Sequence, residues 1–76
     1  MPTFRIRIIN RDFESHCDAN AHDPRAARSE ALRSALSIGS DEVCEGKSFF
    51  GAEVVIENGG ETVERLVIAI GASTLR

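Results

Sequence analysis

A single helix-forming stretch at residues 24–45 lies between two pairs of strand-like segments, and this order restricts the folds open to the chain. One helix can cover only one face of a sheet, so the opposite face has no cover from this chain. We expect one domain over residues 1–76. The predicted class is α+β: a two-layer fold in which one helix packs on one face of a four-stranded, mainly antiparallel sheet, with the order ββαββ.

The strand segments are recognised by apolar and polar residues that alternate. Phe4, Ile6 and Ile8 alternate with arginines, which is the period of a half-buried strand. The sequence Asn-Gly-Gly at 58–60 is typical of a tight hairpin turn, because both glycines accept positive φ. We predict strands at residues 3–10, 13–18, 52–58 and 62–70 and a loose tail at 71–76. The spatial order 2-1-3-4 is favoured over 2-1-4-3.

The helix has a clear start and stop. Asp23 can cap the free backbone amides, and Pro24 suits the first helical position. The following residues are mostly strong helix formers, and Gly46 is a natural stop. We predict one helix over residues 24–45, with a kink at Gly39 as the alternative. Its apolar stripe consists of Ala27, Ala31, Leu32, Ala35, Leu36, Ile38 and Val43.

Phe49 and Phe50, two of the four aromatic residues, are placed in the connection that follows the helix. Large apolar side chains are normally core, so we expect both to fill the space beneath the helix end. The alternative is an exposed aromatic anchor for a partner.

No arrangement of reactive side chains predicts a catalytic, cofactor or metal site. His16, Cys17, His22 and Cys44 are zinc-ligand types, but adjacent strand residues point to opposite faces, and Cys44 lies at the helix end. No base or oxyanion signature accompanies either cysteine. We therefore expect two free thiols, no cofactor and a protein that is not an enzyme.

Charge and hydropathy limit the classes of partner. The net charge of −3 argues against a strongly basic nucleic-acid binder. The longest apolar run, residues 66–70, is far too short to span a bilayer, and the amino terminus has no signal-peptide apolar stretch. The expected location is cytoplasmic, with no membrane partner.

The uncovered sheet face supplies the candidate interaction site. It mixes apolar residues with charges of both signs, which suggests that a partner covers part of this face or an adjoining edge. A domain this small without disulfides or metal also needs extra stabilisation, so we expect a homodimer. Two alternatives stay open, nucleic-acid binding through the arginines of this face and a ligand or catalytic site built between subunits. The predicted interface residues are Ile9, Val55, Val67, Ala69, Arg5, Arg7, Glu53 and Glu57.

Two segments carry a resemblance to a known family. The helical sequence AARSEALRSAL at 26–36 and the sequence FFGAEV at 49–54, which leads into a Glu-Asn-Gly-Gly-Glu turn, resemble a family of short bacterial proteins catalogued as a domain of unknown function. The resemblance covers residues 1 to about 73. The glycine-containing turn of that family between the first two strands is Asn-Arg-Asp here, at 10–12. The resemblance implies a ββαββ fold and no activity.

Overall fold

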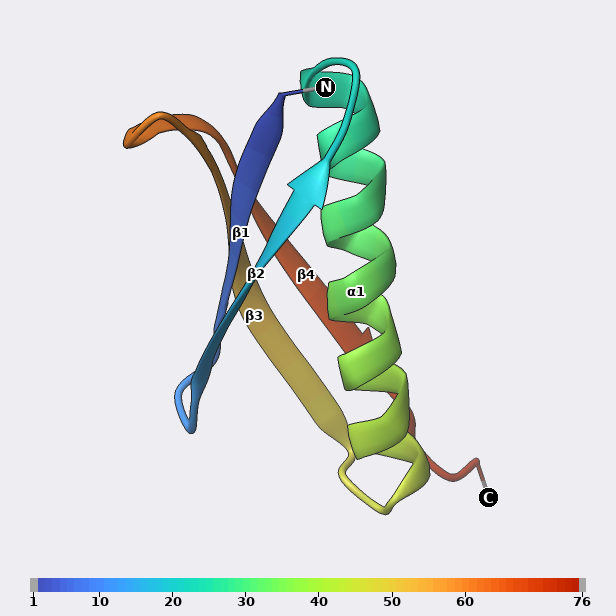
Figure 1. Cartoon of the computed structure of the whole chain (residues 1–76). Helices are drawn as coiled ribbons and strands as arrows, with labels where there is room; N and C mark the ends of the chain where they lie inside the picture. Colours follow the sequence, from blue (N-terminus) through green and yellow to red (C-terminus); the bar gives the residue numbers. More distant parts are fainter. Residues whose placement is uncertain (1, 76) are drawn as a thin grey trace.

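One helix and one sheet form two layers in the computed structural model, which describes residues 2–75 (Figure 1). All neighbouring strands are antiparallel, in the order β2-β1-β3-β4. The predicted α+β class, the ββαββ order and the favoured strand order are therefore confirmed. The elements are β1 (Thr3–Ile9), β2 (Glu14–Asn20), α1 (Pro24–Cys44), β3 (Phe49–Asn58) and β4 (Glu61–Gly71).

The second hairpin is longer than the sequence indicated. β3 begins at Phe49 and not at Ala52, because Phe49 pairs with Gly71 and Phe50 pairs with Ile70. The two rings consequently point to opposite faces: Phe50 is 2% exposed in the core, whereas Phe49 is 62% exposed. Placing both in a connection was wrong, and so was the expectation that both are core. Gly71 belongs to β4, and Arg76 of the predicted tail lies outside the described residues.

The two hairpin turns close by different means. Gly59 and Gly60 have φ of 63° and 85°, the positive values that the tight turn between β3 and β4 requires. The turn between β1 and β2 lacks glycine and uses a side chain: the Asp12 amide donates to Asn10 Oδ1 at 2.8 Å, and the Asn10 amide donates to the Phe13 carbonyl at 2.9 Å. An asparagine side chain thus replaces the backbone freedom of glycine.

α1 starts as predicted and continues without a break through Gly39. The carboxylate of Asp23 accepts a hydrogen bond from the Ala26 amide at 2.9 Å, which satisfies one of the free amides of the first turn. Gly39 is buried against the sheet, where an added Cβ would lie 2.5 Å from Ile70 Cδ1 and 2.8 Å from Phe50 Cδ2. Gly39 therefore allows a close approach of helix and sheet. Within residues 2–75, no helix is long and apolar enough to cross a membrane.

The helix and the sheet contribute very different side chains to the core. The buried residues of α1 are Ala27, Ala31, Ala35 and Gly39, at four-residue spacing. The leucines of the predicted stripe are not part of this set: Leu32 is partly buried, and Leu36 is 43% exposed. Leu32, Ile38 and Val43 of the predicted stripe still pack against the core, so Leu36 alone departs from the prediction. The large buried side chains come from the sheet: Phe4, Phe50, Ile6, Ile8, Ile56 and Val54.

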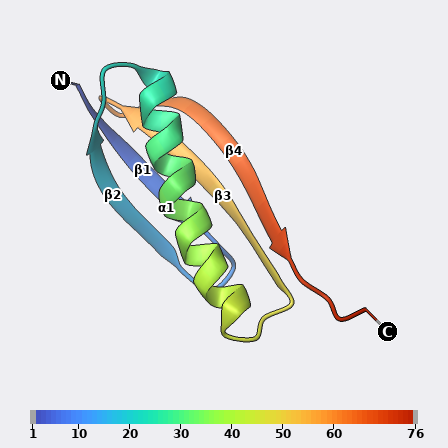
Figure 2. The same cartoon turned by 90° about the vertical axis from the view of Figure 1, so that its right-hand side faces the viewer.

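Figure 2 shows α1 in front of the sheet, with β2 and β4 along its two sides. The helix packs mainly on β3 and β4. β2 and β4 are the two edges of the sheet.

The close approach at Gly39 is testable by adding volume. We expect Gly39→Val to lower the free energy of unfolding by about 1–3 kcal/mol, because the side chain would overlap Ile70 and Phe50 in a packed core. Ser40→Val is the matched control, since Ser40 is exposed and serine and valine have similar helix propensities. Urea unfolding of both variants measures the difference. Equal losses would show that Gly39 does not limit the packing.

Candidate functional site

The face of the sheet opposite α1, called the outer face below, carries all eight predicted interface residues. Cross-strand pairing places Arg5 opposite Glu57, Arg7 opposite Val55, and Ile9 opposite Glu53 between β1 and β3. β4 completes the rows, with Val67 opposite Glu53 and Ala69 opposite Gly51. The predicted residues are thus on one face, spread over three strands.

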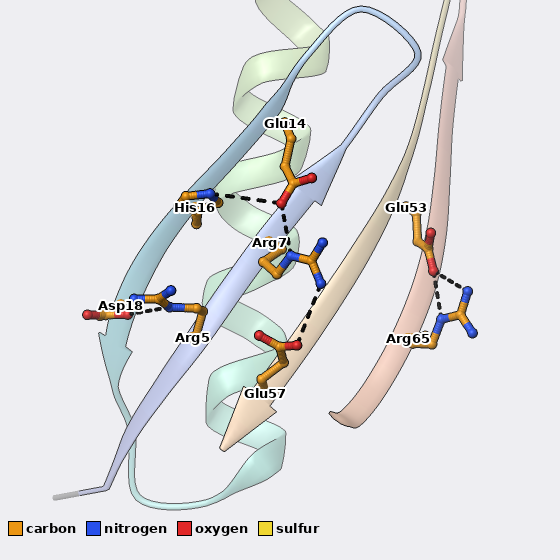
Figure 3. Close-up of polar contacts among 8 residues, drawn as sticks. All are labelled: Arg5, Arg7, Glu14, His16, Asp18, Glu53, Glu57 and Arg65. Carbon is orange, nitrogen blue, oxygen red and sulfur yellow. Dashed lines mark hydrogen bonds and ion pairs between the residues drawn. The ribbon is translucent and has the colours of Figure 1, made fainter. Parts of the chain in front are cut away.

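The charges of the outer face are paired within the chain (Figure 3). Arg7 lies at the centre: its Nε donates to Glu14 Oε2 at 2.9 Å, and its Nη1 is 3.6 Å from Glu57 Oε2. Arg65 Nε donates to Glu53 Oε2 at 2.6 Å. Arg5 Nε is 3.5 Å from Asp18 Oδ1. The arginines and glutamates of this face therefore have ion-pair partners within one chain.

This pairing shifts two pKa values. The Arg7 guanidinium lowers the pKa of the Glu14 carboxyl, chiefly by its hydrogen bond, and Glu14 in turn raises the pKa of Arg7. Both groups lie at the surface, so the pair fixes side-chain orientation and adds little stability.

The apolar residues of the outer face are only partly accessible. Val55 is 5% exposed, since it stands between Arg7 on one neighbouring strand and Arg65 on the other. Ile9 is half-buried. Among the predicted interface residues, the accessible apolar side chains, Val67 and Ala69, both lie on β4, and Val67 is 81% exposed. Apart from Phe49 at the start of β3, the accessible apolar surface is therefore at the β4 edge and not at the centre of the face.

The β4 edge carries an uncharged aliphatic run, Leu66–Ile70. Its outward-facing residues are exposed, and two of its inward-facing residues, Leu66 and Ile70, are only partly buried although they face the helix side. Within residues 2–75, no strand flanks β4 on its far side. A row of backbone amides and carbonyls next to aliphatic side chains is the usual template for pairing with another strand.

A flank of α1 adjoins this edge. Arg28 Nε is 3.1 Å from Glu64 Oε2 on β4, so the side of the helix that carries Arg28 faces the edge strand. Leu32 and Leu36 follow Arg28 at four-residue spacing and so continue on the same flank. Leu32 packs against the core, as predicted, and is only partly buried. Sequence reasoning missed the exposure of Leu36 because it assigned this residue to the core as well.

The reactive side chains do not form a site. Cys17 and Cys44 are free and exposed. Among residues 2–75, no three His, Cys, Asp or Glu side chains are grouped as a metal site. Lys47 borders an open hollow with Ser48 and Ser73, but its Nζ lies 2.7 Å from Glu42 Oε1. Glu42, mainly through this hydrogen bond, raises the pKa of Lys47, so the amine stays protonated and is a poor general base.

Comparisons with known proteins add no further assignment: no family model, no curated protein and no solved structure matches this chain. The resemblance to the bacterial family of unknown function stays a prediction.

The Arg7–Glu14 pair leads to a prediction about pH. Because the pKa of Glu14 is lowered in the folded chain, the carboxylate contributes stability above its pKa in the unfolded chain, about 4.3. This contribution is lost as the pH falls through the lower pKa of the folded chain. We expect the Glu14 carboxyl to titrate below an ordinary glutamate by NMR, and Arg7→Gln to return it toward the usual value. Arg65→Gln, which removes a partner of Glu53, should leave Glu14 unchanged. An unshifted Glu14 in the wild type would contradict the pairing.

Proposed function

We propose that this protein is a non-enzymatic interaction domain that associates with a second copy of itself. The observation that supports the proposal best is the β4 edge, where the run Leu66–Ile70 has no charge and, in the part of the chain that the structure describes, no covering strand. Val67 on this run is 81% exposed.

The two edges of the sheet differ in the way that distinguishes a protected edge from a pairing edge. β2, with 7 residues against 11 in β4, carries Glu14, His16 and Asp18 on its outer side, and charged residues on an edge discourage strand pairing. Its inward-facing residues Ser15 and Cys17 are also exposed and offer little apolar surface. β4 has none of this protection between residues 66 and 70. Proteins normally cover or pair such a strand.

The amount of exposed surface supports the same proposal. The chain has 5268 Å² of accessible surface, whereas a monomeric protein of 8.3 kDa has about 4,600 Å². The Cα radius of gyration is 13.5 Å, against about 11 Å for a compact domain of this length. An open, elongated two-layer domain gains most from burying surface against a partner.

Nucleic-acid binding has weaker support. Arg5, Arg7 and Arg65 each contact a carboxylate, so they are not available to neutralise phosphates without breaking an ion pair. An aromatic residue, Phe49, does lie on the outer side of β3. It stands six residues from Val55, about 20 Å along the strand, too far to stack a base held by the arginines.

Sedimentation tests the proposal. We expect the wild-type chain to sediment as a concentration-dependent dimer at micromolar concentrations, and Val67→Lys to weaken the dimer at least tenfold. The substitution places a charge on the edge strand at a position that is 81% exposed, so the fold should be unaffected.

Ser15→Lys on the β2 edge is the control, because it adds the same charge to the other exposed edge and should leave the dimer unchanged. Circular dichroism of both variants checks that the monomer is folded. A wild-type chain that stays monomeric over the whole concentration range would refute self-association.

A further inference from the structure

We infer that two copies join edge to edge along β4, antiparallel, about a two-fold axis beside Ile68 and Leu36, and that their α1 helices pack against each other across this axis. The inference rests on the proposed self-association and specifies its geometry. The assembly is one continuous eight-stranded sheet covered on one side by a pair of helices.

The charges of β4 select the register. When a strand pairs antiparallel with its own copy, a central residue faces itself and the others are reflected about it. A centre at Arg65 would place the two copies of this arginine directly opposite each other. A centre at Leu66 would place Glu64 of one copy opposite Ile68 of the other. A centre at Ile68 folds the run Leu66–Ile70 onto itself, so that aliphatic residues meet aliphatic residues. Glu64 and Arg65 then fall opposite small residues beyond the run, Ala72 and Gly71.

The symmetry decides where the helices lie. Antiparallel pairing of two identical edge strands requires a two-fold axis perpendicular to the sheet, and such an axis keeps the same face of both sheets on the same side. Since each α1 covers the inner face, both helices lie on one side of the joined sheet, next to the new junction.

Contacts between α1 and β4 give the level of the axis along the helix. Arg28 contacts Glu64, and Gly39 lies against Ile70, so the helix and β4 run in the same direction. A helix rises about 1.5 Å per residue and a strand about 3.3 Å per residue. Between the two contacts, Ile68 of β4 is therefore level with about residue 35 of α1. The most exposed apolar side chain of that flank, Leu36, is therefore at the level of the axis.

The spacing suits contact between the helices. α1 packs mainly on β3 and β4. If its axis lies over the gap between these strands, two such helices are about 10 Å apart, because strands are about 4.8 Å apart. That separation is close to the 8–10 Å of packed helices, so Leu36 of each copy meets Leu36 of the other. Reflection about Leu36 then puts Arg33 level with residues 39–40 of the other helix, and not with a second arginine.

A second copy fits these observations better than a foreign strand. A bound peptide would satisfy the backbone of β4 but would leave Leu36 exposed above it. The aliphatic run of β4 and the exposed leucine of α1 are separate features in the sequence, and one two-fold axis buries both.

Disulfide trapping tests the geometry. Facing Cα atoms on helices about 10 Å apart are about 5–6 Å apart, within the range that a disulfide bridges. In a background with Cys17→Ser and Cys44→Ser, we expect Leu36→Cys to form a covalent dimer under mild oxidation. Ser37→Cys, also exposed but turned about 100° around the helix, should cross-link at least tenfold more slowly. Non-reducing gels follow both rates, and sedimentation of the cysteine-free background shows whether it dimerises as the wild type does.

The outcomes separate the two proposals. A cysteine-free chain and wild type that are both monomeric would refute self-association itself. A wild-type dimer that Val67→Lys weakens, combined with equal cross-linking of Leu36→Cys and Ser37→Cys, would overturn only the helix contact and its axis. A dimer unaffected by Val67→Lys would overturn the β4 junction.

Discussion

The close contact between α1 and the sheet determines most of this structure. Ala27, Ala31, Ala35 and Gly39 form a line without large side chains, so the helix comes near enough for the isoleucines and phenylalanines of the sheet to fill the layer between them. A helix that sits this close contacts the sheet along one narrow line. Of the larger apolar residues on its flanks, Leu32 is only partly buried against the core and Leu36 is 43% exposed.

The outer face shows how a sheet surface without a covering layer is stabilised within one chain. Oppositely charged residues stand on neighbouring strands, and the arginine side chains lie over apolar neighbours, which reduces the exposure of Val55 to 5%. Each ion pair contributes little free energy at this exposure. Together they keep the apolar stems of the arginines in place. Arginine stems from both neighbouring strands can cover an apolar residue in the middle of the face. At the edge, β4 has one neighbouring strand within residues 2–75, so its residues receive this cover from one side.

The fold was largely predictable from sequence, whereas the accessible surface was not. Alternation in β1, the Asp23 cap and the Asn-Gly-Gly turn depend on local chemistry, and each is present as expected. The face of each outer residue also followed from alternation, but its exposure depends on neighbours in space. Val55 and Val67 have the same pattern in sequence and differ because one is central and the other is at the edge. The exposure of Leu36 could not be predicted in the same way, because it depends on the distance between helix and sheet. The buried alanines of α1 set that distance together.

The difference between the two edges also bears on how far association can proceed. If β2 and β4 were equally apolar, the β4 edge of one copy could pair with the β2 edge of the next, and this head-to-tail contact would grow into an open fibre. β2 instead presents Glu14, His16 and Asp18, and two of these residues already contact arginines of β1. In the proposed assembly the β4 edge is the one that pairs, and it is used up when it meets its own copy. The charges on β2 thus agree with a proposed assembly of two subunits.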